Sequence, residues 1–93
     1  MTTWDEAKRR KNIKDRGIDF VGCEAIWDNF TITREDVRQA YGEKRLVTFG
    51  ILEGTVAVLV YTERRTGPHI ISLRNAEKHE KRCYFEIAKD YFK

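Results

Sequence analysis

The sequence predicts an α+β domain in which two N-terminal helices and a C-terminal helix pack on a four-stranded antiparallel sheet with strand order 1-2-3-4. Residues 45–76 predict most of the sheet, because they form three consecutive strand-like runs joined by two tight connections. An alternating run at residues 30–39 supplies the other strand, and residues 76–91 repeat apolar side chains at helical spacing. With 93 residues, the chain is expected to form a single domain, residues 1–93.

Capping residues delimit two expected helices before the sheet. The first is expected at residues 5–16, with Asp5 as its N-cap and Gly17 just beyond its C-terminus. The second is expected at residues 19–28, with Asp19 as its cap. The apolar residues of this second helix follow helical spacing and are expected in the core: Phe20, Cys23, Ile26 and Trp27.

The four expected strands span residues 30–39, 45–51, 56–64 and 69–74. The first becomes polar from Arg34 onward, which is typical of an edge strand protected by charge. Turns are expected at residues 41–43 and 53–54. Residues 56–60 are apolar without interruption, so we expect this strand at the centre of the sheet with both faces covered.

The final helix is expected to begin after Asn75, its N-cap. Glu80 falls within the apolar stripe of this helix. Burying an unpaired carboxylate is costly, so we expect an arginine to pair with Glu80. Phe85 lies among cations on the opposite side, which indicates an exposed surface for a partner.

The composition excludes several classes of protein. Eighteen Lys and Arg against 15 Asp and Glu give a net charge of +3, which permits a polyanionic partner without requiring one. Cys23 and Cys83 belong to no CxxC pair and the histidines lack metal-ligand spacing, so two reduced core cysteines and no metal or cofactor are expected. No apolar run approaches the roughly 18 residues of a membrane span. The charged N-terminus is unlike a signal peptide, so we expect a cytoplasmic protein without membrane contact.

The expected strand pairing gathers the basic residues in two clusters. Pairing Arg64 with His69 puts Arg74 near Leu59, so the two arginines would lie roughly 17 Å apart at about 3.4 Å per residue. The first cluster, near Tyr41 and Tyr61, consists of Lys44, Arg45, Arg64 and Arg65. The second consists of Arg74, Lys78, His79 and Arg82.

These clusters fit cleavage of RNA without a metal ion. This chemistry needs a base for the ribose 2′-OH, cations for the phosphate and an acid for the leaving 5′-oxygen. His79 is the candidate acid or base, and Glu63 is a second candidate base. Arg64 and Arg74 are candidate phosphate clamps, since a guanidinium binds two oxygens at once. The same residues also fit a non-catalytic module that binds a partner or nucleic acid, or an interaction protein with solvated charges.

Seven short motifs follow one another between Trp4 and Tyr84. They are W-D-E-A-K (4–8), N-I-K (12–14), G-I-D-F (17–20), D-V-R (36–38), Y-G-E-K-R (41–45), Y-T-E-R (61–64) and I-I-S-L-R-N-A (70–76). In this order and spacing, followed by Glu80, they resemble the BrnT toxins of bacterial type II toxin–antitoxin systems. The chain departs from that pattern at Arg16, where a His is common, at Leu73, where a small residue is usual, and at Glu77, where Ser or Thr is usual.

The resemblance implies a RelE-like fold and an endoribonuclease that slows translation. It also implies a BrnA-type antitoxin, which silences the toxin in a hetero-oligomeric complex that represses its own operon. The catalytic residues predicted on these combined grounds are Arg64, Arg74, Lys78 and His79. The predicted RNA contacts are Lys44, Arg45, Arg65 and Arg82.

Overall fold

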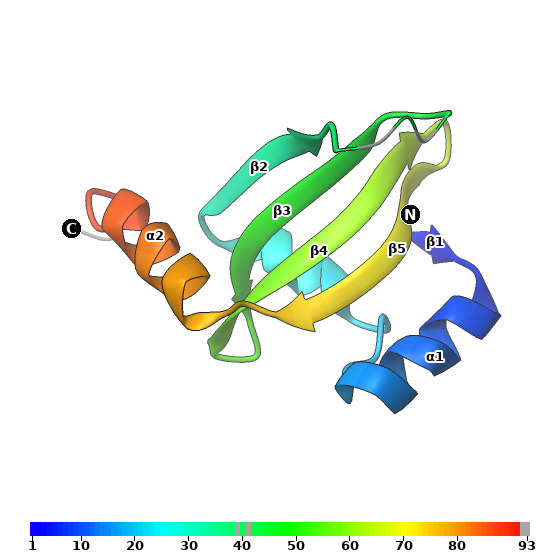
Figure 1. The fold of residues 1–93 in the computed structure, drawn as a ribbon, viewed down its shortest axis with the longest axis horizontal. Helices are drawn as coiled ribbons and strands as arrows, with labels where there is room; N and C mark the ends of the chain where they lie inside the picture. Colours follow the sequence, from blue (N-terminus) through cyan, green and yellow to red (C-terminus); the bar gives the residue numbers. More distant parts are fainter. Residues whose placement is uncertain (39, 41, 92–93) are drawn as a thin grey trace.

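The computed structural model, described for residues 1–38, 40 and 42–91, contains a five-stranded mixed sheet, two α-helices and one 3₁₀ helix, η1 (Figure 1). The elements in chain order are β1 (Thr3–Trp4), α1 (Glu6–Arg16), η1 (Cys23–Asp28), β2 (Thr31–Asp36), β3 (Arg45–Leu52), β4 (Thr55–Arg64), β5 (Gly67–Asn75) and α2 (Lys78–Ala88). The strand order is β1-β5-β4-β3-β2. Only the β1–β5 pair is parallel among these described strands.

The expectation of a four-stranded antiparallel sheet is wrong, because Thr3–Trp4 adds a fifth strand. Thr3 pairs with His69 and Trp4 with Ile70, in parallel. Two residues are too few to show an alternating pattern, so this strand forms only because β5 offers it an edge. The other expected strand positions are close to β2–β5, although Gln39, at the end of the expected 30–39 run, lies outside the described residues.

The expectation of two N-terminal α-helices is also wrong. In α1, the Asp5 carboxylate accepts a hydrogen bond from the Ala7 N–H at 2.8 Å, and Gly17 ends the helix at φ 72°, as the sequence predicted. No such helix spans residues 19–28, because Gly22 adopts φ 86° in the left-handed region and leaves only the short η1 after it. Asp19 caps no helix and instead accepts two hydrogen bonds from Arg9.

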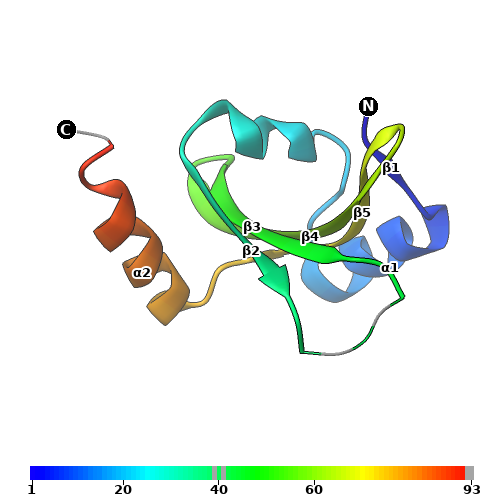
Figure 2. The ribbon, with the colours of Figure 1, turned by 90° about the horizontal axis from the view of Figure 1, so that it is seen from above.

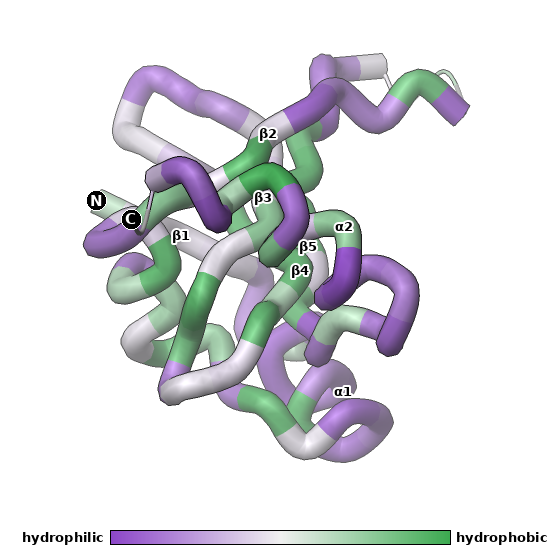
Figure 3. The backbone as a smooth tube through the Cα atoms, turned by 90° about the vertical axis from the view of Figure 1, so that its left-hand side faces the viewer, coloured by the Kyte–Doolittle hydropathy of each residue, from purple (hydrophilic) through white to green (hydrophobic). Residues whose placement is uncertain are grey.

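The two faces of the sheet pack against different elements. Figure 2 shows η1 over one face, with α1 and α2 on the other side. Against η1, the core consists of Phe20, Cys23, Ile26, Ala57, Leu59, Tyr61, Ile70 and Leu73. Against α2, it consists of Val47, Phe49, Val56, Val58, Ala76, Tyr84 and Ala88. Figure 3 shows hydrophobic stretches along the strands and more hydrophilic stretches along the helices, and β4 is buried from both faces as expected.

The two edges of the sheet differ. Beyond β1, the edge of β5 is closed by the buried Asn12 of α1, whose side-chain amide donates to the Leu73 carbonyl at 2.8 Å and accepts from the Leu73 N–H at 3.2 Å. This contact holds α1 beside the sheet. The opposite edge strand, β2, pairs only with β3 among the described residues, as its charged sequence predicted.

Helix α2 begins later than expected. Asn75 remains in β5, and Glu77 is the N-cap in a reciprocal capping box with Glu80. Cys23 is buried, but Cys83 is exposed on α2, so the expectation of two core cysteines is wrong for Cys83. No helix in the described part of the chain is long and apolar enough to cross a membrane.

Candidate nucleic-acid interface

One face of the sheet, opposite η1, carries arginines from several strands; we call it the groove face. Paired residues on neighbouring strands project to the same face, so the strand register assigns its side chains. The row nearest α2 consists of Ile32, Phe49, Val58 and Arg74. The middle row consists of Arg34, Val47, Val60 and Ser72. The row farthest from α2 consists of Asp36, Arg45, Thr62 and His69.

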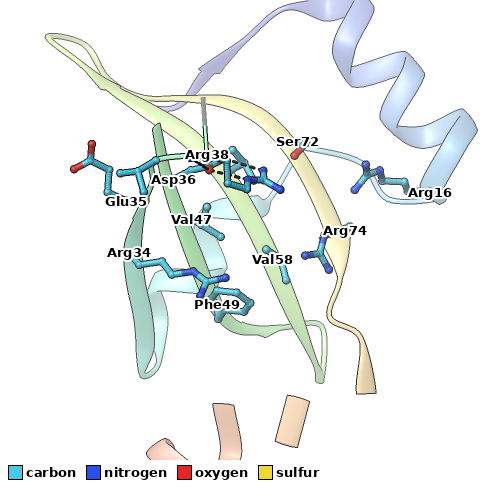
Figure 4. Close-up of a pocket in the computed structure, with 12 residues that line it drawn as sticks. Arg16, Arg34, Glu35, Asp36, Arg38, Val47, Phe49, Val58, Ser72 and Arg74 are labelled. Carbon is cyan, nitrogen blue, oxygen red and sulfur yellow. Dashed lines mark hydrogen bonds and ion pairs between the residues drawn. The ribbon is translucent and has the colours of Figure 1, made fainter. Parts of the chain in front are cut away.

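A groove of about 510 Å³ runs over this face. Figure 4 shows guanidinium groups around it from α1, from β2 with the residues just after it, and from β5: Arg16, Arg34, Arg38 and Arg74. Its apolar lining is formed by Val47, Phe49, Val58 and Val60. The cations can hold phosphates, and the Phe49 ring offers a face on which a base can stack, two features of single-stranded nucleic-acid sites.

Two arginines of the groove are oriented by neighbouring side chains. Arg38 donates to both carboxylate oxygens of the buried Asp36 at 2.9 Å each, while its own side chain stays 80% exposed. The Arg34 guanidinium lies over the Phe49 ring, 5.2 Å from the ring centre. This cation–π contact holds the guanidinium plane over the floor of the groove.

At the α2 end, Arg74 is held by Glu80. Arg74 Nη1 and Nη2 donate to the two Glu80 carboxylate oxygens at 2.7 and 2.9 Å, which confirms the expected arginine partner. The Arg74 bonds lower the pKa of Glu80 to about 2. Because a guanidinium has five N–H donors, Arg74 retains donors for another acceptor, and its side chain is 33% exposed.

A second hollow of about 330 Å³ adjoins the groove beside α2. It shares Arg34 and Phe49 with the groove and is also lined by His79 and Glu80. The structure therefore brings Arg74 and His79 of the second predicted cluster to connected hollows. Lys78 and Arg82 of that cluster are exposed on α2 and line neither hollow; their predicted roles remain predictions.

The first predicted cluster lies at the other end of the groove face. Arg64 Nη2 donates to Glu43 at 2.9 Å, with both side chains 47% exposed, and Arg64 lowers the pKa of Glu43. Arg45 pairs with Thr62, two residues before Arg64. Lys44 lies 3.8 Å from Glu35, and Arg65 is exposed in the following turn.

Three details of this cluster differ from expectation or cannot be compared. Arg64 pairs with Gly67 rather than His69, because only two residues separate β4 from β5. A bulge between Val60 and Tyr61 then shifts the register by one residue, and Arg74 pairs with Val58 rather than Leu59. Tyr61 points into the core under η1, where its hydroxyl shares a hydrogen bond with the Thr48 hydroxyl. It therefore lies on the opposite face of the sheet from the cluster. Tyr41 lies outside the described residues.

Sequence reasoning did not assign four side chains of the groove face: Arg16, Arg34, Arg38 and His69. Arg34 could have been found, since it alternates with Ile32 and therefore shares its face. Arg16 could not, because only the packing of α1 on β5 brings it to the groove. No group of three or more His, Cys, Asp or Glu among the described residues could hold a metal ion.

The fold and this face define a small α+β domain with an arginine-lined surface suited to a phosphate-rich ligand. The model of one protein family, described as the ribonuclease toxin BrnT of a type II toxin–antitoxin system, matches residues 4–80 of the 93. The chain belongs to the BrnT family of ribonuclease toxins, and a protein antitoxin and RNA are accordingly its partner and target. No individual curated protein matches the chain.

Proposed function

We propose that this toxin cuts single-stranded RNA on the groove face, without a metal ion, and thereby inhibits translation in the cytoplasm. The observation that carries the proposal is the convergence on one groove of four arginines from α1, from β2 with the segment just after it, and from β5. An RNA strand lying across this face from Arg64 to Arg74 would have a guanidinium within reach along its whole length. Sequence-independent phosphate contacts of this kind supply most of the affinity for nucleic acid.

Arg64 and Arg74 hold phosphates at opposite ends of the strand. Val58, the partner of Arg74, precedes Arg64 by six residues along β4, so the two ends are roughly 20 Å apart at about 3.4 Å per residue. That distance spans several nucleotides rather than one phosphate. Lys44, Arg45, Arg65, Lys78 and Arg82 add positive potential around the two ends.

Both arginines are paired with carboxylates in the free protein, so a phosphate must compete with these carboxylates in either function. Arg64 is paired with Glu43 and Arg74 with Glu80 in the free protein. A phosphate reaching Arg64 must displace or share a carboxylate. An exposed pair contributes only about 0–1 kcal/mol, so the Arg64–Glu43 pair is readily opened.

Cleavage of an unstructured RNA in EDTA separates the two functions. Wild-type protein should produce fragments ending in a 2′,3′-cyclic phosphate. Arg64→Ala or Arg74→Ala should lose at least about tenfold in rate, according to which arginine stabilises the transition state. Intact RNA with salt-sensitive binding would instead support the binding module, and wild-type rates in both variants would refute the assignment of the arginines.

The antitoxin is proposed to be of BrnA type and to bind the outer side of α2 beside the open edge of β2. Phe85 is more than half exposed on α2, and exposed aromatic side chains of this kind anchor protein interfaces. Phe85→Asp should weaken capture by the protein encoded next to this toxin while leaving RNA cleavage unchanged. Unchanged capture would exclude Phe85 from the interface.

A further inference from the structure

His69 is placed on the groove face by the strand register, beside the first basic cluster. It pairs with Thr62 of β4, which in turn pairs with Arg45 of β3. On its other side it pairs with Thr3 of β1, whose hydroxyl lies 2.8 Å from His69 Nδ1. The short parallel strand β1 therefore fixes the orientation of the imidazole ring.

The ring is left with one nitrogen available for proton transfer. Thr3 occupies Nδ1, and Nε2 has no hydrogen-bond partner among the described residues. When Nδ1–H donates to the Thr3 hydroxyl, Nε2 carries the lone pair that a general base needs. The buried Thr62 hydroxyl next to it also has no hydrogen-bond partner among the residues that the structure describes.

The surroundings of His69 favour its neutral form. Burial is the main cause that lowers the pKa of His69 below its ordinary value, and Arg64 lowers it further. The charged groups that act on it come from α1, from the segment before β3 and from β4: Asp5, Lys8, Glu43 and Arg64. Arg45 lies in the same row across the sheet. A neutral imidazole at pH 7 is the form that accepts a proton.

The other histidine has a less suitable position. His79 is 73% exposed, and its Nδ1 lies 3.8 Å from a Glu77 carboxylate oxygen. The neighbouring Arg74 makes two hydrogen bonds to the largely buried Glu80, whereas Arg64 makes one bond to the exposed Glu43 carboxylate. The corner with His69 thus combines an oriented base with an arginine, Arg64, that can leave its carboxylate partner at little cost and bind a phosphate.

We infer that His69 is the general base of the cleavage reaction, with Arg64 and Arg45 holding the scissile phosphate. This inference rests on the ribonuclease activity proposed above. Nε2 of His69 takes the proton of the ribose 2′-OH as the 2′-oxygen bonds to phosphorus. The bond from phosphorus to the 5′-oxygen breaks, leaving a 2′,3′-cyclic phosphate; the 5′-oxygen takes a proton from water, and His69 later returns its proton to water.

The test compares His69→Asn with His79→Asn. The sequence alone predicts that His79→Asn is the slow variant, whereas the inference predicts that His69→Asn is. Single-turnover cleavage of an unstructured RNA is followed in EDTA across pH, and binding is measured with a 2′-O-methyl RNA that cannot react. His69→Asn should lose at least about 100-fold in rate, the lower range for general base catalysis, while affinity stays within about twofold. Imidazole added to His69→Ala should restore part of the rate.

The pH profile supplies a readout that a merely structural role would not change. The wild-type rate should rise with pH through the lowered pKa of His69, and the same pKa should appear in an NMR titration of that ring in the wild-type protein. This measurement does not depend on a variant that folds. Wild-type cleavage with a kinetic pKa that matches His79 instead, or a full rate in His69→Asn, would overturn the inference; absence of wild-type cleavage would instead refute the proposed function.

Discussion

Replacing Glu80 by Gln should destabilise the protein at neutral pH, because it removes the charge that pairs with Arg74. Lowering the pKa of Glu80 from 4.5 to about 2 corresponds to about 3 kcal/mol at about 1.36 kcal/mol per pKa unit. Arg74 is one-third exposed, so solvent screening reduces the expected loss to about 2 kcal/mol. The glutamine can still accept the Glu77 N–H bond of the capping box, so the loss reports the ion pair.

Urea unfolding at pH 7 and pH 3 is the assay. A carboxylate whose pKa is lowered on folding contributes fully above its unfolded pKa of 4.5, and the contribution is lost as the pH falls toward 2. The difference between wild type and Glu80→Gln should therefore shrink at pH 3. The control is Glu86→Gln, which removes the exposed Glu86–Lys89 pair on the same helix and should change stability by less than about 0.5 kcal/mol. A Glu80→Gln protein as stable as wild type at pH 7, or a loss that is equal at both pH values, would refute the reasoning.

Three further predictions concern the groove, the core and the cysteines. Arg34→Ala should weaken binding of 2′-O-methyl RNA and reduce the slope of log affinity against log salt by about one, measured by fluorescence anisotropy; an unchanged slope would exclude a phosphate contact. Gly50→Ala should lower the melting temperature, because the alanine Cβ would lie 2.7 Å from Ile26 Cγ1 and 3.1 Å from the Ile26 carbonyl oxygen. Crowding of this kind costs about 1–3 kcal/mol, and an unchanged melting temperature would contradict this packing. Cys83 should react with a thiol reagent in the native protein, while Cys23 should stay unreactive until the protein unfolds. The reason is that Cys23 is buried and burial raises its pKa to about 12. Fast reaction of both thiols in the native protein would contradict the fold.

Local signals in the sequence were sufficient for the limits of α1 and for the partner of Glu80. Asp5 and Gly17 predicted the limits of α1, because caps act within a few residues. Glu80 predicted its own arginine partner, because a carboxylate in an apolar stripe needs one. Gly22 carried the signal against a second helix, but the helical spacing of apolar residues around it outweighed this signal in the prediction.

The parts that could not be predicted depend on contacts distant in sequence. The strand β1 has no pattern of its own and forms through pairing with residues 69–70. Arg16 reaches the groove only because Asn12, four residues earlier, bonds the edge of β5 at Leu73. His69 was paired two residues out of register, because the turn was expected to span residues 65–68 whereas β5 already begins at Gly67.

NMR mapping of RNA on the protein tests the central claim most directly. The amide shifts of isotope-labelled protein are recorded while a short 2′-O-methyl RNA is added at low salt. We expect the largest changes along β2–β5 at groove-face positions such as Arg34, Ser72 and Arg74, with small changes at η1. Changes confined to η1 or to the outer side of α2, or no saturable change, would contradict an RNA site on this face of the sheet.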